Sequence, residues 1–147
     1  MADKVILSEP YGAVFADDAV PCVVVQFHDF ANREQFKNIM STGLACYLAH
    51  SQPGAPWGWV GDTRRMGAIP KEVQQWLTDE WNKQAFAAGI REISIVVSEN
   101  VFGQLATQQY VQQTTAVQDA YELIPRYYKS LEEAKQGAAQ RLTTLKS

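Results

Sequence analysis

Cysteine and histidine are scarce in this chain, with two of each among 147 residues. Cys22 and Cys46 lack Cys-x-x-Cys spacing, so they predict neither a disulfide framework nor a thiolate metal site. We expect both thiols to be reduced and buried, which favours a cytoplasmic location. His28 and His50 have no accompanying cluster of cysteines and carboxylates. The sequence therefore predicts no metal and no cofactor.

An excess of basic charge and a long apolar run are also missing. Thirteen Lys and Arg residues against sixteen Asp and Glu residues give a formal net charge of −3, whereas nucleic-acid binding needs a basic surface. No apolar run approaches the roughly 20 residues of a membrane-spanning helix. The start of the chain, residues 1–4, has no basic region of a secretion signal. We expect no nucleic-acid partner, no membrane span and no secretion.

The common catalytic motifs are absent as well. The chain contains no Gly-x-Ser-x-Gly, no Walker loop and no Gly-x-Gly-x-x-Gly, so hydrolase, nucleotidase and dinucleotide-dependent functions lose their usual support. One enzymatic hypothesis stays open, a small hydrolase or isomerase in which His28 or Asp62 acts as the base.

The composition indicates one globular domain over residues 1–147, with strands in 1–19 and the core in 20–145. Hydrophobic residues make up 46% of the chain, enough to bury a sizeable core. The apolar segment 20–27 shows no alternation, which is typical of a strand covered on both faces. Strands are predicted at 5–7, 13–15, 20–27, 57–61, 92–97 and 120–128, with helices following the third and each later strand. This alternation predicts an α/β fold: a mixed, mostly parallel sheet of five or six strands with about four helices.

Local signals mark the ends of these helices. Asn32 with Gln35 and the segment Ser130–Glu133 both have the spacing of a capping box. Ser98 or Asn100 is expected to cap the third helix, and Gly89 to end the second in a left-handed conformation. Residues 114–119 are predicted to form a loop. Pro125 cannot donate a ladder hydrogen bond, so the last strand is predicted to lie at a sheet edge.

The carboxyl ends of parallel strands are where ligands usually bind in open α/β sheets. Three predicted strand ends carry polar residues, namely 28–29, 62–65 and 98–100. These groups are expected to approach one another if their strands are neighbours.

The most polar of these strand ends comprises Asp62, Thr63, Arg64 and Arg65. Two guanidinium groups suit a carboxylate or phosphate, and Asp62 is placed to orient one of them. The alternative interpretation is a solvated turn in which Asp62 bonds backbone amides. Replacing both Arg64 and Arg65 by Ala is expected to abolish capture of the ligand or partner while leaving the melting temperature within a few degrees, as for other surface changes.

Two of the four tryptophans are candidates for the apolar walls of this site. Trp57 and Trp59 flank a turn rich in Pro and Gly, and aromatic side chains commonly line ligand cavities. Packing in the hydrophobic core is the alternative role for both residues.

Short segments throughout the chain resemble one family. They are Trp59–Arg65, Trp76–Leu77, Ala88–Ile90, Asn100–Phe102 and Ser130–Ala134. Together they are similar to small stand-alone bacterial proteins of the STAS-like superfamily, related to SpoIIAA-like anti-sigma-factor antagonists and to CRAL-TRIO lipid-binding domains. The resemblance spans most of residues 20–145 and implies a mixed sheet in a binding or regulatory domain without catalysis of its own. The phosphorylatable serine of the antagonists has no counterpart, because the matching helix start reads Ile69-Pro70-Lys71-Glu72.

The leading hypothesis is therefore a non-catalytic domain that binds a protein partner or a small anionic or amphipathic ligand. A structural protein that assembles with copies of itself, for example as a homodimer, is a third hypothesis beside the enzyme.

Overall fold

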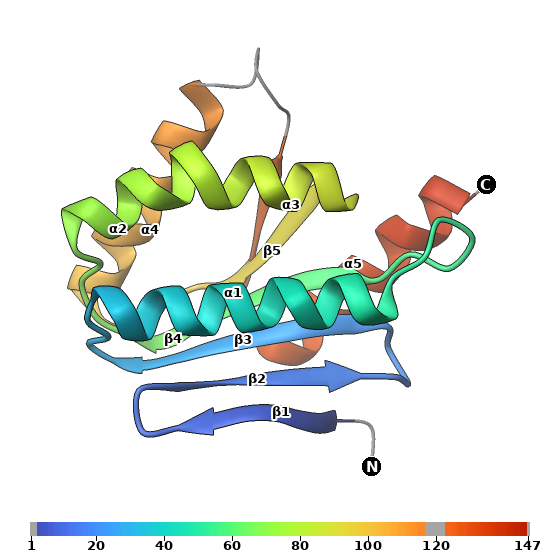
Figure 1. The fold of residues 1–147 in the computed structure, drawn as a ribbon, viewed down its shortest axis with the longest axis horizontal. Helices are drawn as coiled ribbons and strands as arrows, with labels where there is room; N and C mark the ends of the chain where they lie inside the picture. Colours follow the sequence, from blue (N-terminus) through green and yellow to red (C-terminus); the bar gives the residue numbers. More distant parts are fainter. Residues whose placement is uncertain (1–2, 117–122, 147) are drawn as a thin grey trace.

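The computed structural model describes residues 3–116 and 123–146, and its centre is a six-stranded mixed sheet (Figure 1). The strands lie in the sheet in chain order, β1 to β6. β1 pairs with β2 and β2 with β3 in antiparallel fashion, whereas β3 to β6 are parallel. Their bounds are β1 Asp3–Glu9, β2 Gly12–Asp17, β3 Cys22–Asp29, β4 Gly58–Met66, β5 Glu92–Val96 and β6 Ile124–Tyr128. The predicted fold class is confirmed.

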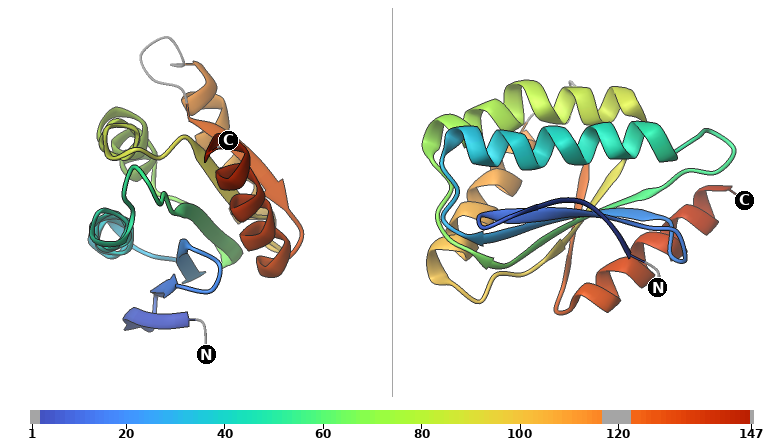
Figure 2. Two further views of the ribbon diagram at one scale, coloured as in Figure 1. Left: turned by 90° about the vertical axis from the view of Figure 1, so that its right-hand side faces the viewer. Right: turned by 60° about the horizontal axis from the view of Figure 1, so that its bottom comes forward.

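Helices cover both faces of this sheet. They are α1 Arg33–His50, α2 Lys71–Trp76, a π-helical turn η1 Leu77–Trp81, α3 Asn82–Ala88, α4 Val101–Ala116 and α5 Leu131–Lys146. Successive parallel strands add in one direction, so their right-handed crossovers place α1, α2–α3 and α4 on one face. α5 follows the last strand and lies on the opposite face (Figure 2). The two faces of the sheet therefore face different helix layers.

Each layer has its own hydrophobic core. The larger core lies between the sheet and α1, α2–α3 and α4, with Trp59 and Trp81 among its members. The smaller core packs Ala134 and Ala138 of α5 against valines of the central strands. Residues 23–25 of β3 are all buried, because a strand between two helix layers has no solvent face. This burial confirms the prediction that the apolar segment forms a strand covered on both faces.

In most cases the helix starts and ends carry the capping residues that the sequence predicts. Asn32 and Gln35 form the capping box of α1, and the Asn100 side chain accepts the backbone N–H of Phe102 at the start of α4. Gly89 follows α3 with φ of 111°, a left-handed conformation that glycine adopts without a steric penalty. At α5 the Ser130 hydroxyl accepts the Glu133 N–H, but the Glu133 carboxylate accepts from Lys129 N.

The predicted second helix contains a π turn. Val73, Leu77, Trp81 and Ala85 are all buried in the core, although residues spaced by four drift about 40° per step around a regular helix of 3.6 residues per turn. The wider turn at 77–81 offsets this drift, so the four side chains remain on the face that meets the sheet.

Most strand boundaries differ from the prediction by one or two residues, and the larger differences are in three places. β4 continues through residues 62–65 to Met66, so the interpretation of this segment as a solvated turn is wrong. α4 includes residues 114–116, which were predicted as loop, and the rest of that loop, 117–119, lies outside the described residues. Of the predicted strand 120–128, residues 120–122 also lie outside them, and β6 begins at Ile124. Pro125 lies on an edge strand, as predicted.

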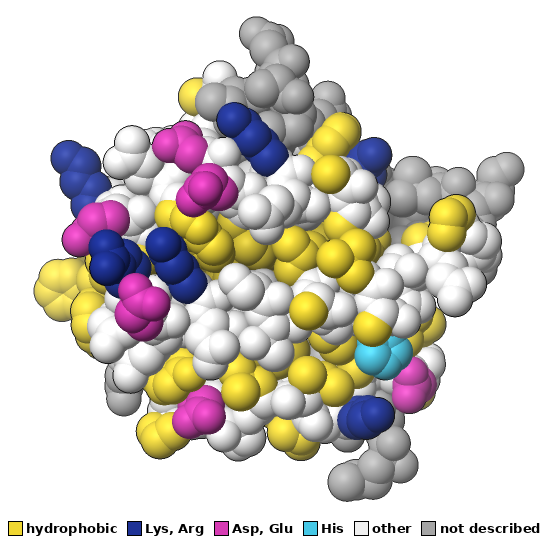
Figure 3. Space-filling view, in the orientation of Figure 1, with side chains coloured by type: hydrophobic (Ala, Val, Ile, Leu, Met, Phe, Trp, Pro, Cys, Tyr) yellow, Lys and Arg dark blue, Asp and Glu magenta, His cyan; other side chains and the backbone are white. Residues whose placement is uncertain are grey.

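The described helices include none with the length and hydrophobicity needed to cross a bilayer. On the outer surface, hydrophobic side chains form a band between α1 and α2–α3 (Figure 3).

Candidate functional site

The three polar strand ends come together at the carboxyl ends of the parallel strands. His28 of β3 is in register with Arg65 of β4. The backbone N–H of Glu99, in the loop after β5, donates to the Arg64 carbonyl over 3.0 Å. Neighbouring parallel strands bring their carboxyl ends to the same edge, which is the reason the sequence-level expectation is correct.

A bulge in β4 determines which side chains share a face. Gln26 is opposite Asp62 and His28 is opposite Arg65, so two steps along β3 correspond to three along β4. Strict alternation would direct Arg64 and Arg65 to opposite faces. The extra residue instead places both arginines beside Gln26 and His28, around one polar cavity of about 150 Å³. Bulges of this kind commonly redirect side chains next to functional sites.

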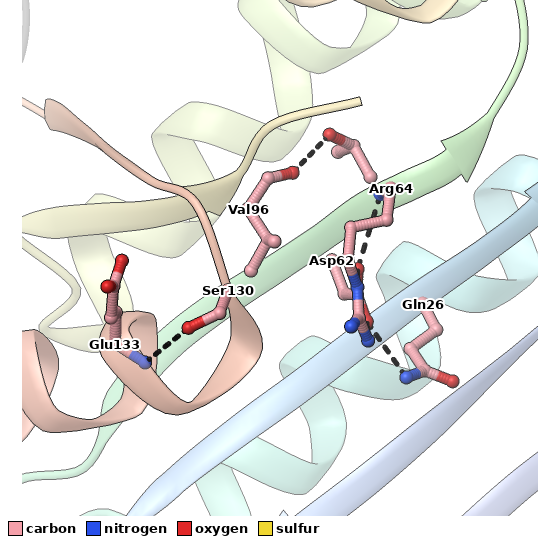
Figure 4. A network of polar contacts seen from close by, with 7 residues as sticks. Gln26, Asp62, Arg64, Val96, Ser130 and Glu133 are labelled. Carbon is pink, nitrogen blue, oxygen red and sulfur yellow. Dashed lines mark hydrogen bonds and ion pairs between the residues drawn. The ribbon is translucent and has the colours of Figure 1, made fainter. Parts of the chain in front are cut away.

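Asp62 and Arg64 form an ion pair at the base of this cavity (Figure 4). Arg64 Nε donates to Asp62 Oδ1 over 2.9 Å, and Arg64 Nη2 donates to Oδ2 over 2.7 Å. Gln26 Nε2 donates to the same Oδ2 over 2.9 Å. The Asp62 residue is only 4% exposed, so this carboxylate is held by hydrogen bonds rather than by water. The pair fixes the direction of the Arg64 guanidinium.

The electrostatics of Arg64 follow from these contacts. Hydrogen bonding to Asp62 raises the pKa of Arg64 above its usual value, burial opposes this, and the charges of Asp62 and Glu99 reinforce it. Two of its donor nitrogens are used by Asp62. Within the described residues, its third nitrogen, Nη1, makes no hydrogen bond and is free to bind a further acceptor.

Arg65 is the exposed cation of the cavity. Unlike that of Arg64, its side chain has no hydrogen bond or ion pair to any part of the chain that the structure describes. His28 is half-buried beside it and lines the same cavity. Arg65 and His28 therefore add hydrogen-bond donors to the cavity that Arg64 also lines.

Thr63 does not belong to this cavity. Its side chain is on the opposite face of β4, and its hydroxyl donates to the Val96 carbonyl. It is buried, so Thr63 links β4 to β5 rather than facing a ligand at the arginines.

The structure does not bring the two tryptophans to the arginines either. Trp57 precedes β4, about 20 Å along an extended chain from Arg64, and its ring contacts His50 at a centroid distance of 4.7 Å. Trp59 is buried on the other face of the sheet against Trp81, with ring centroids 5.0 Å apart. Trp59 is therefore a core residue, because strand alternation directs it away from the face that carries Asp62.

Gln26 is the site residue that sequence reasoning missed. It is a half-buried polar residue within the apolar run 20–27, and a polar side chain removed from water in a central strand needs a hydrogen-bond partner. That signal predicts a polar contact, but it does not identify Asp62, which is 36 positions away.

The geometry gives the enzymatic hypothesis little support. His28 and Asp62 line the same cavity, but both Asp62 oxygens already accept hydrogen bonds from Arg64. Both carboxylate oxygens of Asp62 are therefore already engaged as hydrogen-bond acceptors within the chain. Among the described residues, no group of three or more His, Cys, Asp and Glu side chains is arranged to hold a metal ion.

Neither a protein-family model, nor a curated protein, nor a solved structure matches this chain.

Proposed function

We propose that this chain is a non-catalytic binding domain that recognises an anionic group, a carboxylate or a phosphate, on an amphipathic ligand or protein partner. The observation that carries the proposal is the β4 bulge, which gathers Arg64, Arg65 and His28 around one cavity. Planar guanidinium groups match the oxygens of both anions. Asp62 orients Arg64 in advance, which reduces the entropy lost on binding.

Apolar side chains near the cavity support an amphipathic partner. α4 begins two residues after Glu99, whose backbone binds the Arg64 carbonyl. Its first two residues, Val101 and Phe102, are about two-thirds exposed. Phe30, directly after β3, is also exposed. An exposed apolar group beside a cationic pocket fits a molecule with an anionic head and an apolar neighbour.

A regulatory role and kinship with STAS-like domains remain part of the proposal. The mixed sheet with helices on both faces supports this kinship at the level of fold class alone. Phosphorylation at Thr63 is not included, because its hydroxyl is buried and bonded to Val96. Regulation would then operate through occupancy of the arginine pocket.

Titration with a defined probe tests the proposal. Octyl phosphate supplies the anionic and apolar parts, and inorganic phosphate supplies the anion alone. We expect saturable shifts of the backbone amide resonances of Gln26, Asp62 and Arg65, with tighter binding of octyl phosphate. Arg65→Ala should weaken binding about tenfold, the equivalent of one charge-assisted hydrogen bond at a partly exposed site.

Lys83→Ala is the matched control, because it removes one positive charge from an exposed position on α3. It should leave both affinities unchanged. Equal weakening by Arg65→Ala and Lys83→Ala would show that only net charge matters, and an absence of shifts at the three amides would refute the proposal.

Self-assembly is a second candidate, favoured by the exposed edge strand β1. Val5 and Ile6 lie on this edge and are exposed, and unpaired strand edges accept further strands. Sedimentation equilibrium measures the mass directly. A monomer that still binds octyl phosphate would exclude this candidate and leave the first intact.

A further inference from the structure

We infer that the cavity inside the larger core is a binding site for a small apolar molecule that carries a single hydrogen-bonding group. The cavity lies between β4 and the helices of the opposite face from the arginine pocket, and its volume is about 60 Å³. All its lining residues are buried. It is therefore separate from the site of the proposed function.

The cavity exists because of a glycine in the middle of the central strand β4. Alternation directs Trp59, Gly61 and Thr63 toward the helix layer, and all three line the cavity. A Cβ atom added to Gly61 would have no atom within 4 Å. Glycine weakens the interior of a strand, and it often marks a place where a ligand approaches the backbone closely. At Gly61 the protein leaves space that an alanine or valine would fill.

A residue that lines the same space carries a buried polar atom without a partner. Thr107 of α4 lines the cavity and is 8% exposed, and its Oγ1 is the one buried side-chain N or O atom among the described residues without a hydrogen bond. Leaving a buried hydroxyl unbonded costs about 1–3 kcal/mol. The other nearby hydroxyls are already used, since Thr63 donates to Val96 and Tyr110 donates to Asn82. Thr107 is thus available to a ligand.

The chemistry of the walls selects the class of ligand. A buried water needs two to four polar partners, and here Thr107 is the main one. The aromatic and aliphatic side chains of Trp59, Leu77 and Trp81 favour an apolar body. Because a cavity of about 150 Å³ accommodates benzene, this one suits about two to four heavy atoms, the size of a short-chain alcohol.

Two further features fit a binding site. The π turn supplies both Leu77 and Trp81 to the wall, and π turns within α-helices are frequent at functional sites. Thr107 also lines a depression of about 450 Å³ on the outer surface, next to Ser98 and Tyr127. Thr107 therefore borders both the cavity and this depression on the surface.

The test uses xenon and 1-propanol as probes of the full chain, with the indole N–H resonances of Trp59 and Trp81 as reporters. We expect saturable shifts of both resonances with both probes. Gly61→Val should abolish both responses by filling the space. Gly54→Val is the matched control, because a Cβ there also has no atom within 4 Å but the position is an exposed turn; it should retain both.

Thr107→Val separates a ligand site from a packing void. It keeps the side-chain shape, so xenon should bind as before, while 1-propanol should bind about fivefold more weakly for the loss of one neutral hydrogen bond. The inference is overturned if neither probe gives saturable shifts, or if 1-propanol binds Thr107→Val as well as the natural chain. If Gly61→Val fails to fold by circular dichroism, Gly61→Ala replaces it and should weaken both responses. Arg65→Ala should change neither, which distinguishes this site from the arginine pocket.

Discussion

Arg64→Ala should destabilise the protein far more than Arg65→Ala, although the two residues are adjacent. Arg64 makes a bidentate ion pair with the buried carboxylate of Asp62, so its removal leaves that charge without its main partner. Arg65 is exposed and has no partner among the described residues. We therefore expect Arg64, unlike Arg65, to contribute to the stability of the fold.

The magnitude follows from burial. Breaking a fully buried ion pair costs about 3–5 kcal/mol, but the Arg64 side chain is 38% exposed, so solvent screens the pair. Gln26 and the backbone N–H of residue 64 still bind Asp62 in the variant. We expect a loss of about 1–2 kcal/mol for Arg64→Ala and at most about 0.5 kcal/mol for Arg65→Ala. For a chain of this length, the first value lowers Tm by about 3–8 °C.

Urea unfolding of the single variants, and a double-mutant cycle with Asp62→Asn, measures these values. Asp62→Asn removes the buried charge, so Arg64→Ala should cost much less in that background, with a coupling energy of about 1 kcal/mol. If Arg64→Ala and Arg65→Ala cost the same, or if the coupling energy is zero, the ion pair has no structural role. Binding experiments on Arg64 variants then need no correction for stability.

Three further outcomes are expected. Burial opposes ionisation of Asp17, but its hydrogen bonds, chiefly from Lys135 of α5, lower the pKa of Asp17 overall. The ionised Asp17 therefore stabilises the folded state at pH values above its unfolded pKa of about 3.9. This contribution is lost as the pH falls through the pKa of Asp17 in the folded state. Asp17→Asn should therefore reduce the dependence of stability on pH below about 4, and an unchanged acid-unfolding curve would contradict this. Gly43→Ala should lower the free energy of unfolding, measured in urea, by about 1–2 kcal/mol, because a Cβ there would lie 2.6 Å from the buried Trp59 ring. This overpacking should outweigh the gain in helix propensity. A variant as stable as the natural chain, or more stable, would refute the tight contact. Burial raises the pKa of the Cys46 thiol. Near neutral pH, Cys46 in the native protein should therefore react with a thiol reagent much more slowly than it does in the unfolded chain. Equal rates would show that the thiol is accessible.

Local sequence signals predicted much of the fold. The caps at Asn32 and Asn100 and the stop at Gly89 depend on residues within one helical turn. The apolar run of β3 indicates burial on both faces without any knowledge of its neighbours. These signals predicted the order of elements and the edge position of Pro125.

The candidate site was predicted in part. Asp62, Arg64 and Arg65 line one cavity, as the cluster of polar residues indicated. Thr63 and Trp59 face the opposite side, because they occupy the other positions of a strand that the sequence prediction ended too early. Gln26 joined the site only through its pairing with a strand far along the chain.

The sequence by itself determined the class of fold, the helix ends and the identity of the polar strand ends, since each rests on periodicity or on contacts within a few residues. Only the tertiary structure decided that Arg64 and Arg65 line one cavity together with the buried Asp62, and that Gly61 and Thr107 line another. These features depend on register and packing between segments that lie more than thirty residues apart. The free energy of such contacts is not contained in either segment alone.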